Sequence, residues 1–310
     1  FSAMIKNFLV SVLILILLGL SVFVGLGTHK SKEKTFDFNG THRKYRVHLP
    51  KGYVGSGQYP VVLALHGLSF GARVMELETG FSKLADKEGF IVVYPYGSHP
   101  NPFIPYSWNS EFCCAYAYKE NIDDVGFIAS LIIDLREQYN IENNKVYIAG
   151  HSNGGMLGHY VALKHPDKVR AAAFVSSAVG GKVYEDDEFY LFEKSYKSIP
   201  VMIINGRNDL AVPFDGGEVG DIDLYSFSSA YDAVNLWLEN NSCNKHPAEI
   251  SNQDNFTKEI YTECDNNADV IFIAHNGAHR WPGGAKDIFK SISGQTINAT
   301  DLIWEFFKDH

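Results

Sequence analysis

The sequence feature that most constrains the fold of this 310-residue chain is the pentapeptide GHSNG at residues 150–154. It lies between the apolar run Val146–Ala149 and a helix-like stretch over Gly155–Lys164. A G-x-S-x-G pentapeptide between a strand and a helix is typical of a nucleophile elbow, a strained turn that exposes the serine hydroxyl above a β-sheet. A side chain in place of either glycine would collide with the adjoining strand or helix. The pattern therefore predicts that Ser152 is a nucleophile.

Short apolar runs that are rich in branched residues recur along the chain, and each is too short for a helix. We interpret them as buried parallel strands, with segments of helical period between and after them. This alternation predicts an α/β fold with a doubly wound, mostly parallel sheet and right-handed crossovers. The predicted strands are Val61–Leu65, Ile91–Tyr94, Val146–Ala149, Ala172–Val175, Val201–Ile204 and Val270–Ala274, and the predicted helices are Met75–Glu88, Val125–Tyr139, Ser226–Leu238 and Leu302–Phe307.

An antiparallel hairpin is predicted ahead of this sheet. The segments Thr35–Phe38 and Tyr45–Leu49 flank the pair Asn39-Gly40, which readily adopts the positive φ values of a type I′ turn. We expect the mature domain to begin with this hairpin.

The N-terminal run Phe8–Leu26 is almost entirely apolar and has Lys6 ahead of it. Such a run is a signal peptide or a membrane anchor, and its length lies near the upper limit for a cleaved signal. We divide the chain into a leader or anchor over 1–30 and a catalytic domain over 31–310. We favour cleavage and a secreted or periplasmic protein, with an uncleaved anchor as the alternative, in which case alone the chain contacts a membrane.

The four cysteines, Cys113, Cys114, Cys243 and Cys264, fit an exported protein, because disulfides persist in oxidising compartments. We favour a bridge between Cys243 and Cys264 across the polar loop that separates them. Cys113 and Cys114 form a vicinal bridge or remain buried thiols. We expect no metal site, since no C-x-x-C or paired histidine spacing accompanies these cysteines.

Serine needs an imidazole to accept its proton and a carboxylate to orient that imidazole, here expected in the order Ser, acid, His. Asp209 follows the predicted strand Val201–Ile204, and His279 follows Val270–Ala274. We therefore predict that Ser152, Asp209 and His279 are the catalytic residues. The alternatives lie further from the strand or within its end: Asp215, Asp221 and Asp223 are interpreted as loop acids and His275 as structural.

The oxyanion of a tetrahedral intermediate needs N–H donors. One is predicted to be the backbone N–H of Asn153, and the other that of Leu68, with Ser69 as the alternative, in the loop after Val61–Leu65. His66 and His151 are interpreted as residues that brace these turns.

Two aromatic residues are candidates for substrate contact. Trp108 and Trp281 either line an acyl pocket or brace their loops, and the irregular segments Tyr94–Tyr118 and Gly181–Ser198 are candidate substrate-facing loops. Asp123 and Asp124 precede a helix, where acids complement the helix dipole.

The charge balance excludes one class of partner. A net charge of −9 and a pI near 5.7 argue against non-specific nucleic-acid binding, which draws on clustered lysine and arginine. Four matches to the N-glycosylation pattern are present, and we assign them no function.

Several motifs together resemble the secreted α/β-hydrolases that include polyhydroxybutyrate depolymerase-like esterases and feruloyl or acetylxylan esterases. The motifs are GHSNG at 150–154, Asn205-Gly206 through Val212-Pro213, Ala278–Gly283, Trp108-Asn109, Cys113-Cys114, Asp123–Phe127, and Trp237 ahead of Cys243. The resemblance implies hydrolysis of short-chain, acetyl or feruloyl esters of plant polysaccharide or polyester oligomers through an acyl-enzyme, without a metal or organic cofactor. Leu68-Ser69 and Arg280 depart from the family pattern. These departures affect the expected placement of the substrate more than the expected chemistry.

Two other functions compete with this interpretation. A prolyl oligopeptidase-type serine peptidase shares the catalytic order. It normally carries a propeller, which we do not find in this sequence, and acidic residues that grip the amino terminus of a peptide. A non-catalytic binding module anchored to a surface by Phe8–Leu26 is the alternative from another class.

Overall fold

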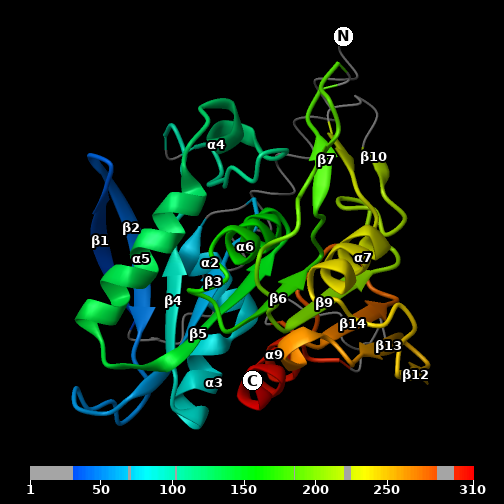
Figure 1. The fold of residues 1–310 in the computed structure, drawn as a ribbon. Helices are drawn as coiled ribbons and strands as arrows, with labels where there is room; N and C mark the ends of the chain where they lie inside the picture. Colours follow the sequence, from blue (N-terminus) through cyan, green and yellow to red (C-terminus); the bar gives the residue numbers. More distant parts are fainter. Residues whose placement is uncertain (1–30, 69–70, 102, 185, 220–224, 285–296) are drawn as a thin grey trace. The chain divides into compact units, whose positions relative to one another are not determined.

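The predicted strands form the parallel centre of a large β-sheet (Figure 1). The computed structural model describes residues 31–68, 71–101, 103–184, 186–219, 225–284 and 297–310. Within those ranges the sheet has ten strands in the order β1-β2-β4-β3-β5-β6-β9-β14-β13-β12. They are β1 (Lys32–Phe38), β2 (Thr41–His48), β3 (Tyr59–Leu65), β4 (Ile91–Pro95), β5 (Ile141–His151), β6 (Ala171–Val175), β9 (Val201–Gly206), β12 (Glu249–Gln253), β13 (Phe256–Tyr261) and β14 (Val270–His275).

The strand directions confirm the predicted mostly parallel sheet. The six strands from β4 to β14 in this order pair in parallel, and they are the six strands predicted from apolar runs. Antiparallel strands extend the sheet at both edges. The N-terminal hairpin is also confirmed: Phe38 pairs with Thr41 across Asn39 and Gly40, whose φ values are 50° and 75°.

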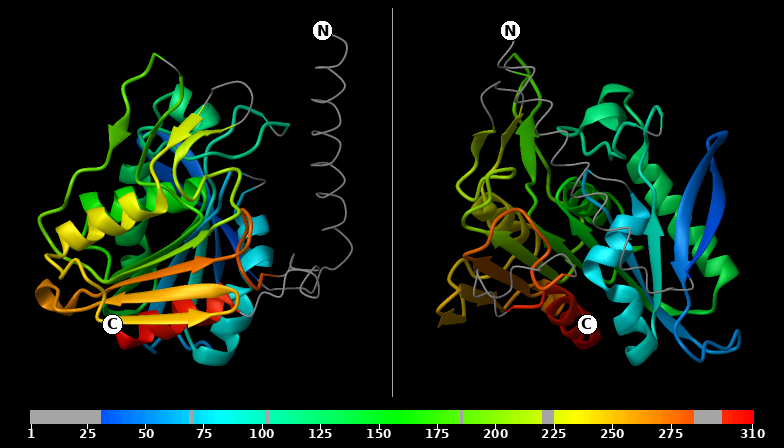
Figure 2. Two further views of the ribbon diagram at one scale, coloured as in Figure 1. Left: turned by 90° about the vertical axis from the view of Figure 1, so that its right-hand side faces the viewer. Right: turned by 180° about the vertical axis from the view of Figure 1, so that it is seen from behind.

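Helices cover both faces of the sheet, and each face has its own apolar cluster. Val61 and Leu63 of β3 face one cluster while Val62 and Ala64 face the other, because successive side chains of a strand alternate. Figure 2 shows the red helix α9 and the yellow helix α7 on opposite sides of the strands. Helices α2 (Ala72–Thr79), α3 (Phe81–Glu88) and α9 (Ala299–Asp309) pack on one face, and α5 (Asp124–Gln138), α6 (Asn153–Lys164) and α7 (Ala230–Asn240) on the other; the short helices are α4 (Ala115–Lys119) and η2 (Asp265–Asn267).

The prediction of a single helix over Met75–Glu88 is wrong, because two helices, α2 and α3, occupy this stretch. They meet at Gly80, whose φ of 68° is left-handed and ends α2. The other three predicted helices are confirmed with shifted ends. Helix α7 begins after Ser229, which forms a capping box with Asp232.

The region between the cysteines of the predicted bridge is also different from the prediction. It was expected to be a polar loop, but it contains strands β12 and β13, which extend the sheet from β14. Their side chains are mostly exposed or half-buried, so the polar sequence gives little sign of strands.

A second, four-stranded sheet has the order β10-β11-β7-β8. Its strands are β7 (Gly180–Lys182), β8 (Tyr190–Leu191), β10 (Gly217–Val219) and β11 (Tyr225–Phe227). Part of the segment Gly181–Ser198, predicted as a loop, therefore lies in this sheet. Phe112, from the other predicted loop, packs against Phe192 at 5.3 Å between ring centroids, so the two segments share a small aromatic cluster.

The predicted bridge between Cys243 and Cys264 is present, with an S–S distance of 2.02 Å. Cys113 and Cys114 are also bridged, which is the first of the two alternatives considered for them. Of the helices in the described ranges, none is long and apolar enough to cross a membrane. The predicted leader or anchor Phe8–Leu26 lies outside those ranges.

We expect that replacing both Cys243 and Cys264 by alanine lowers the free energy of unfolding by about 3 kcal/mol, because the bridge closes a loop between residues 21 positions apart. Urea unfolding of both proteins without reducing agent measures the difference. A free energy unchanged within roughly 0.5 kcal/mol would contradict a stabilising role for this bridge.

Candidate active site

Ser152 lies at the junction of strand β5 and helix α6, in the turn that the sequence predicts as an elbow. Its φ and ψ are 55° and −126°, a strained combination for a residue with a side chain. Its N–H donates to the carbonyl oxygen of Val175 on β6 at 2.9 Å, and its own carbonyl accepts the N–H of Met156 in α6 at 2.9 Å. Hydrogen bonds to the sheet and to the helix therefore hold the strained turn from both sides.

The glycines of the pentapeptide are needed for close packing, as the sequence predicts. A Cβ on Gly150 would overlap the carbonyl oxygen of Gly154, and a Cβ on Gly154 would overlap that of His66 on the segment after β3. Gly67 lies against the turn as well, since a Cβ there would be 3.1 Å from the Cβ of Ser152. The turn is thus enclosed by backbone from two neighbouring strands.

Three side chains from three loops form a continuous chain of hydrogen bonds. Nε2 of His279 lies 2.9 Å from Oγ of Ser152, and Nδ1 of His279 lies 2.7 Å from Oδ2 of Asp209. These residues follow β5, β9 and β14, whose carboxyl ends meet at one edge of the sheet. The structure therefore brings together the three residues that the sequence predicts as catalytic.

The acids and the histidine that were not predicted as catalytic are not part of this chain of hydrogen bonds. Asp215 is exposed, and Asp221 and Asp223 lie outside the part of the chain that the structure describes. His275 is buried at the end of β14, where its Nδ1 accepts the N–H of Gly277 at 3.0 Å.

The carboxylate of Asp209 is buried and fully engaged. Oδ1 accepts the N–H groups of Ala211 and Val212 at 2.9 and 2.8 Å, while Oδ2 faces His279. Burial raises the pKa of Asp209, but the hydrogen bond and charge of His279 and these two N–H groups outweigh it and hold the pKa below its usual value. Asp209 is therefore ionised at neutral pH and accepts a hydrogen bond from Nδ1 of His279, which leaves Nε2 to accept a proton from Ser152.

The loops that carry Asp209 and His279 are fastened to each other by backbone hydrogen bonds. The N–H of Arg207 donates to the carbonyl of His275 at 2.7 Å, and the N–H of Asn208 donates to that of Gly277 at 3.1 Å. Gly206 is required here, because a Cβ would overlap the carbonyl oxygen of Gly277. This contact fixes the separation between the carboxylate and the imidazole.

The predicted oxyanion donors lie where the strand order reverses. The chain passes from β3 to β4 on one side and then to β5 on the other, and such a switch point is where open α/β sheets bind ligands. Asn153 is the first residue of α6, so its N–H points out of the helix N-terminus. Leu68 follows Gly67 in the loop after β3, and its side chain is exposed. The alternative donor, Ser69, lies outside the described ranges.

His66 braces this loop, as the sequence predicts. Its Nδ1 donates to the carbonyl of Gly67 at 2.6 Å and its Nε2 accepts the N–H of Gly97 at 2.9 Å, which together define a neutral tautomer. Burial lowers the pKa of His66 to about 4. The imidazole is therefore uncharged at neutral pH and has no free nitrogen for catalysis.

Both tryptophans considered for substrate contact are buried. The indole N–H of Trp108 donates to the carbonyl of His66 at 2.8 Å, and that of Trp281 donates to Oγ1 of Thr300 at 2.8 Å. These contacts are those of loop bracing, the second of the two interpretations. The ring of His151 stacks on that of His279 with 5.2 Å between centroids, so the variable position of the pentapeptide supports the imidazole.

One structural role at this site, that of the Asn153 side chain, was not predicted from the sequence. The side chain of Asn153 forms two hydrogen bonds with the backbone of Trp108, 45 residues away: Oδ1 accepts its N–H at 2.8 Å and Nδ2 donates to its carbonyl at 3.0 Å. Contacts over such a separation leave no periodic signal in a single sequence.

The described residues contain no candidate metal site among their His, Cys, Asp and Glu side chains. Within those ranges, no group of three or more His, Cys, Asp or Glu side chains is arranged to hold a metal ion.

Fold and site together define an α/β-hydrolase with a Ser-His-Asp arrangement. The model of the Esterase family matches residues 38–262, more than half of the chain, so this chain belongs to the Esterase family of carboxylic ester hydrolases. The structure is similar to acetyl xylan esterase from Aspergillus awamori, with a TM-score of 0.62 and 16% identity over 90% of this chain and 100% of that one. This likeness confirms the fold.

Two curated relatives are similar in sequence. Feruloyl esterase B of Piromyces equi is 25% identical over 81% of this chain, and the bifunctional acetylxylan esterase/xylanase XynS20E of Neocallimastix patriciarum is 24% identical over 84%. The match spans 45% of the length of the first and 34% of the second. These findings confirm the predicted family.

We expect the stability of the protein to fall between about pH 6.5 and pH 4 partly through His66. Its folded pKa of about 4 lies below the ordinary 6.5, so the unfolded chain takes up a proton in this range and the folded chain does not. The loss amounts to about 3 kcal/mol. Urea unfolding at pH 7 and near pH 4 measures it.

The matched variant is His66→Gln, which cannot take up a proton at this position. Its free energy of unfolding should depend less steeply on pH over the same range. Equal slopes for the two proteins would contradict a buried, neutral His66.

Proposed function

We propose that this chain is a serine carboxylesterase that hydrolyses its substrate through an acyl-enzyme on Ser152. The observation that carries the proposal is the unbroken chain of hydrogen bonds from Oγ of Ser152 through His279 to Asp209. Membership of the Esterase family supports the reaction type.

In the first half of the reaction, Oγ of Ser152 attacks the ester carbonyl carbon while Nε2 of His279 takes the hydroxyl proton. The ionised Asp209 stabilises the imidazolium and keeps its Nδ1–H in place. The N–H groups of Asn153 and Leu68 bind the oxyanion of the tetrahedral intermediate. When the intermediate collapses, the C–O bond to the alcohol breaks, and the alcohol leaves with the proton from His279.

In the second half, water takes the place of the alcohol. His279 removes one proton from it as the oxygen attacks the acyl carbon, and the same N–H groups bind the new oxyanion. Collapse breaks the bond to Oγ of Ser152, which regains its proton from His279, and the carboxylic acid leaves. The protein then has its starting protonation state.

The proposed substrates are short-chain, acetyl or feruloyl esters of plant polysaccharide or polyester oligomers. The names of the two curated relatives support acetyl and feruloyl groups. Two leucines on loops that carry site residues, Leu68 and Leu210, are 47% and 87% exposed and offer apolar surface to an acyl group. We propose an extracellular or periplasmic location, with 1–30 as leader or anchor ahead of a catalytic domain over 31–310, and the Cys243–Cys264 bridge fits an oxidising compartment.

We expect Ser152→Ala to lower kcat for p-nitrophenyl acetate by roughly four orders of magnitude, because Ser152 is the proposed acceptor of the acyl group. Asp209→Asn should lower kcat by a comparable factor, since an amide cannot hold His279 in the tautomer that accepts the proton of Ser152. Initial rates on purified protein of confirmed fold measure both.

The matched control is Asp215→Asn, an exposed acid in the same loop region, whose kcat should stay within about twofold of the parent. Parent-like hydrolysis by Ser152→Ala would refute the proposed nucleophile.

Substrate class and the competing functions are tested together. Rates on methyl ferulate, acetylated xylan, tributyrin, a hydroxybutyrate oligomer and a peptide amide should be highest on one of the esters. Faster cleavage of the amide would favour a peptidase. A folded protein that neither hydrolyses these compounds nor reacts with a fluorophosphonate would be the non-catalytic binding module.

A further inference from the structure

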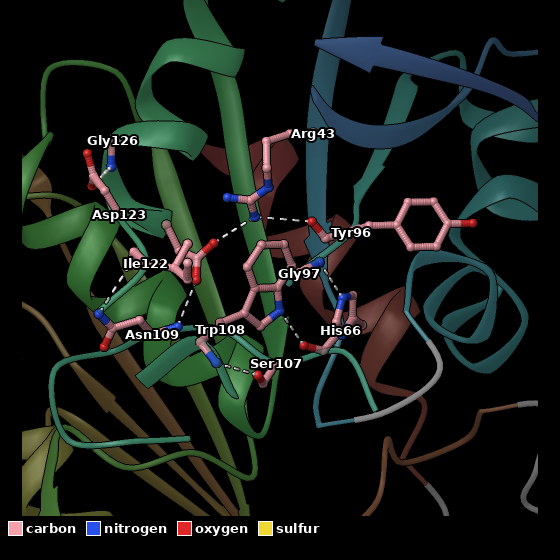
Figure 3. Close-up of polar contacts among 12 residues, drawn as sticks. Arg43, His66, Tyr96, Gly97, Ser107, Trp108, Asn109, Ile122, Asp123 and Gly126 are labelled. Atoms are coloured by element: carbon pink, nitrogen blue, oxygen red, sulfur yellow. Dashed lines mark hydrogen bonds and ion pairs between the residues drawn. The ribbon is translucent and has the colours of Figure 1, made fainter. Parts of the chain in front are cut away.

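A buried ion pair between Arg43 and Asp124 takes no part in the proposed chemistry. Figure 3 shows Arg43 in the same group of polar contacts as Tyr96 and Trp108. Nη2 of Arg43 on β2 lies 2.6 Å from Oδ1 of Asp124 at the start of α5, and the two side chains are 7% and 0% exposed. The guanidinium also lies over the ring of Phe127, 3.9 Å from its centroid, and donates to the carbonyl of Tyr96 at 3.3 Å. Both charges are therefore removed from water and held in one geometry.

The helix dipole, which the sequence suggests as the reason for both Asp123 and Asp124, does not account for Asp124. Asp123 is the residue that caps α5, because its Oδ1 accepts the N–H of Gly126 at 2.8 Å. Asp124 instead faces the interior of the protein. A buried ion pair is weak evidence for a gain in stability, since desolvation offsets the attraction between the charges. Stability alone therefore does not explain why this ion pair is buried at this position.

The second carboxylate oxygen of Asp124, which does not pair with Arg43, binds the segment that carries Trp108. Oδ2 accepts the backbone N–H of Asn109 at 2.8 Å (Figure 3). The side-chain amide of Asn109 donates to the carbonyl of Ile122 at 3.1 Å, so this segment is bound a second time to the turn before α5. The ion pair therefore fixes the backbone at residues 108 and 109.

Trp108 in turn contacts both segments that supply the proposed oxyanion donors, the start of α6 and the loop after β3. Its backbone N–H and carbonyl form the two hydrogen bonds with the side chain of Asn153. Its indole N–H donates to the carbonyl of His66, two residues before Leu68, and its ring lies 4.8 Å from the imidazole of His66 between centroids. One residue thus spans the gap between the loop after β3 and the turn after β5.

We propose that the Arg43–Asp124 ion pair is a positioning element of the oxyanion hole. It fixes Asn109, and through Trp108 it sets the distance between the N–H of Asn153 and that of Leu68. The inference rests on the proposed function. An oxyanion hole gains its effect from donors that are already in place when charge develops, so a small displacement weakens the transition state more than the bound substrate.

The test compares Asp124→Asn with the parent enzyme. The amide keeps an acceptor for the N–H of Asn109 but loses the charge that anchors Arg43. We expect kcat for p-nitrophenyl acetate to fall roughly 10- to 100-fold, with KM changed less than about threefold. Affinity for a trifluoromethyl ketone, whose adduct carries an oxyanion, should fall by the same factor as kcat/KM. Titration with a fluorophosphonate normalises every rate to the fraction of folded, reactive enzyme.

Asp123→Asn is the matched control, because the neighbouring acid caps the same helix and does not contact the Trp108 segment. It should change kcat less than about twofold. Arg43→Lys keeps the charge but not the forked geometry, and it should reproduce the loss of kcat if Asp124→Asn does not fold.

A variant of either ion-pair residue that is less stable but keeps the parent kcat and ketone affinity per titrated site would overturn the inference. If Ser152→Ala still inactivates the enzyme, this result would overturn only the role of the ion pair, and the proposed function would stand. Loss of activity confined to KM would also overturn it, because displaced oxyanion donors act on kcat.

Discussion

Ser152 has a strained backbone conformation, and the elements around it pack so as to hold that conformation in place. A serine with φ of 55° persists only because its surroundings leave no alternative. Gly150 and Gly154 let the backbone of β5, α6 and the loop after β3 approach more closely than any side chain would permit. The same close approach brings Gly67 against Ser152, so one packing arrangement exposes the hydroxyl and places the neighbouring loop beside it.

The remaining parts of the site are held by backbone contacts between loops more than by the reacting side chains themselves. The loops after β9 and β14 are joined through the N–H groups of Arg207 and Asn208, which fixes Asp209 against His279. On the other side of Ser152, Trp108 joins the loop after β3 to the side chain of Asn153. Both sets of hydrogen bonds join loops that follow different strands of the sheet, so they limit how far the loops can move relative to one another.

The sequence predicted the parts of the fold that have a local signal. Apolar runs such as Val201–Ile204 gave all six parallel strands, and the pentapeptide with its strand ends gave the three side chains that meet at the site. It missed the break at Gly80, since helical period continues across it, and strands β12 and β13, whose faces are too polar to read as strands. It could not reveal the contact of Asp124 with Arg43, because 81 residues separate the partners and the adjacent Asp123 offers a simpler local explanation.

The most direct test of the account is to trap the covalent intermediate. Parent enzyme is mixed with p-nitrophenyl acetate, quenched in acid within the first turnover, digested and examined by mass spectrometry. If Ser152 carries the acyl group, we expect a burst of nitrophenol together with one acetyl group on the peptide that contains Ser152, and neither in Ser152→Ala. Turnover with no acetylated peptide, or with acetyl on another residue, would contradict it.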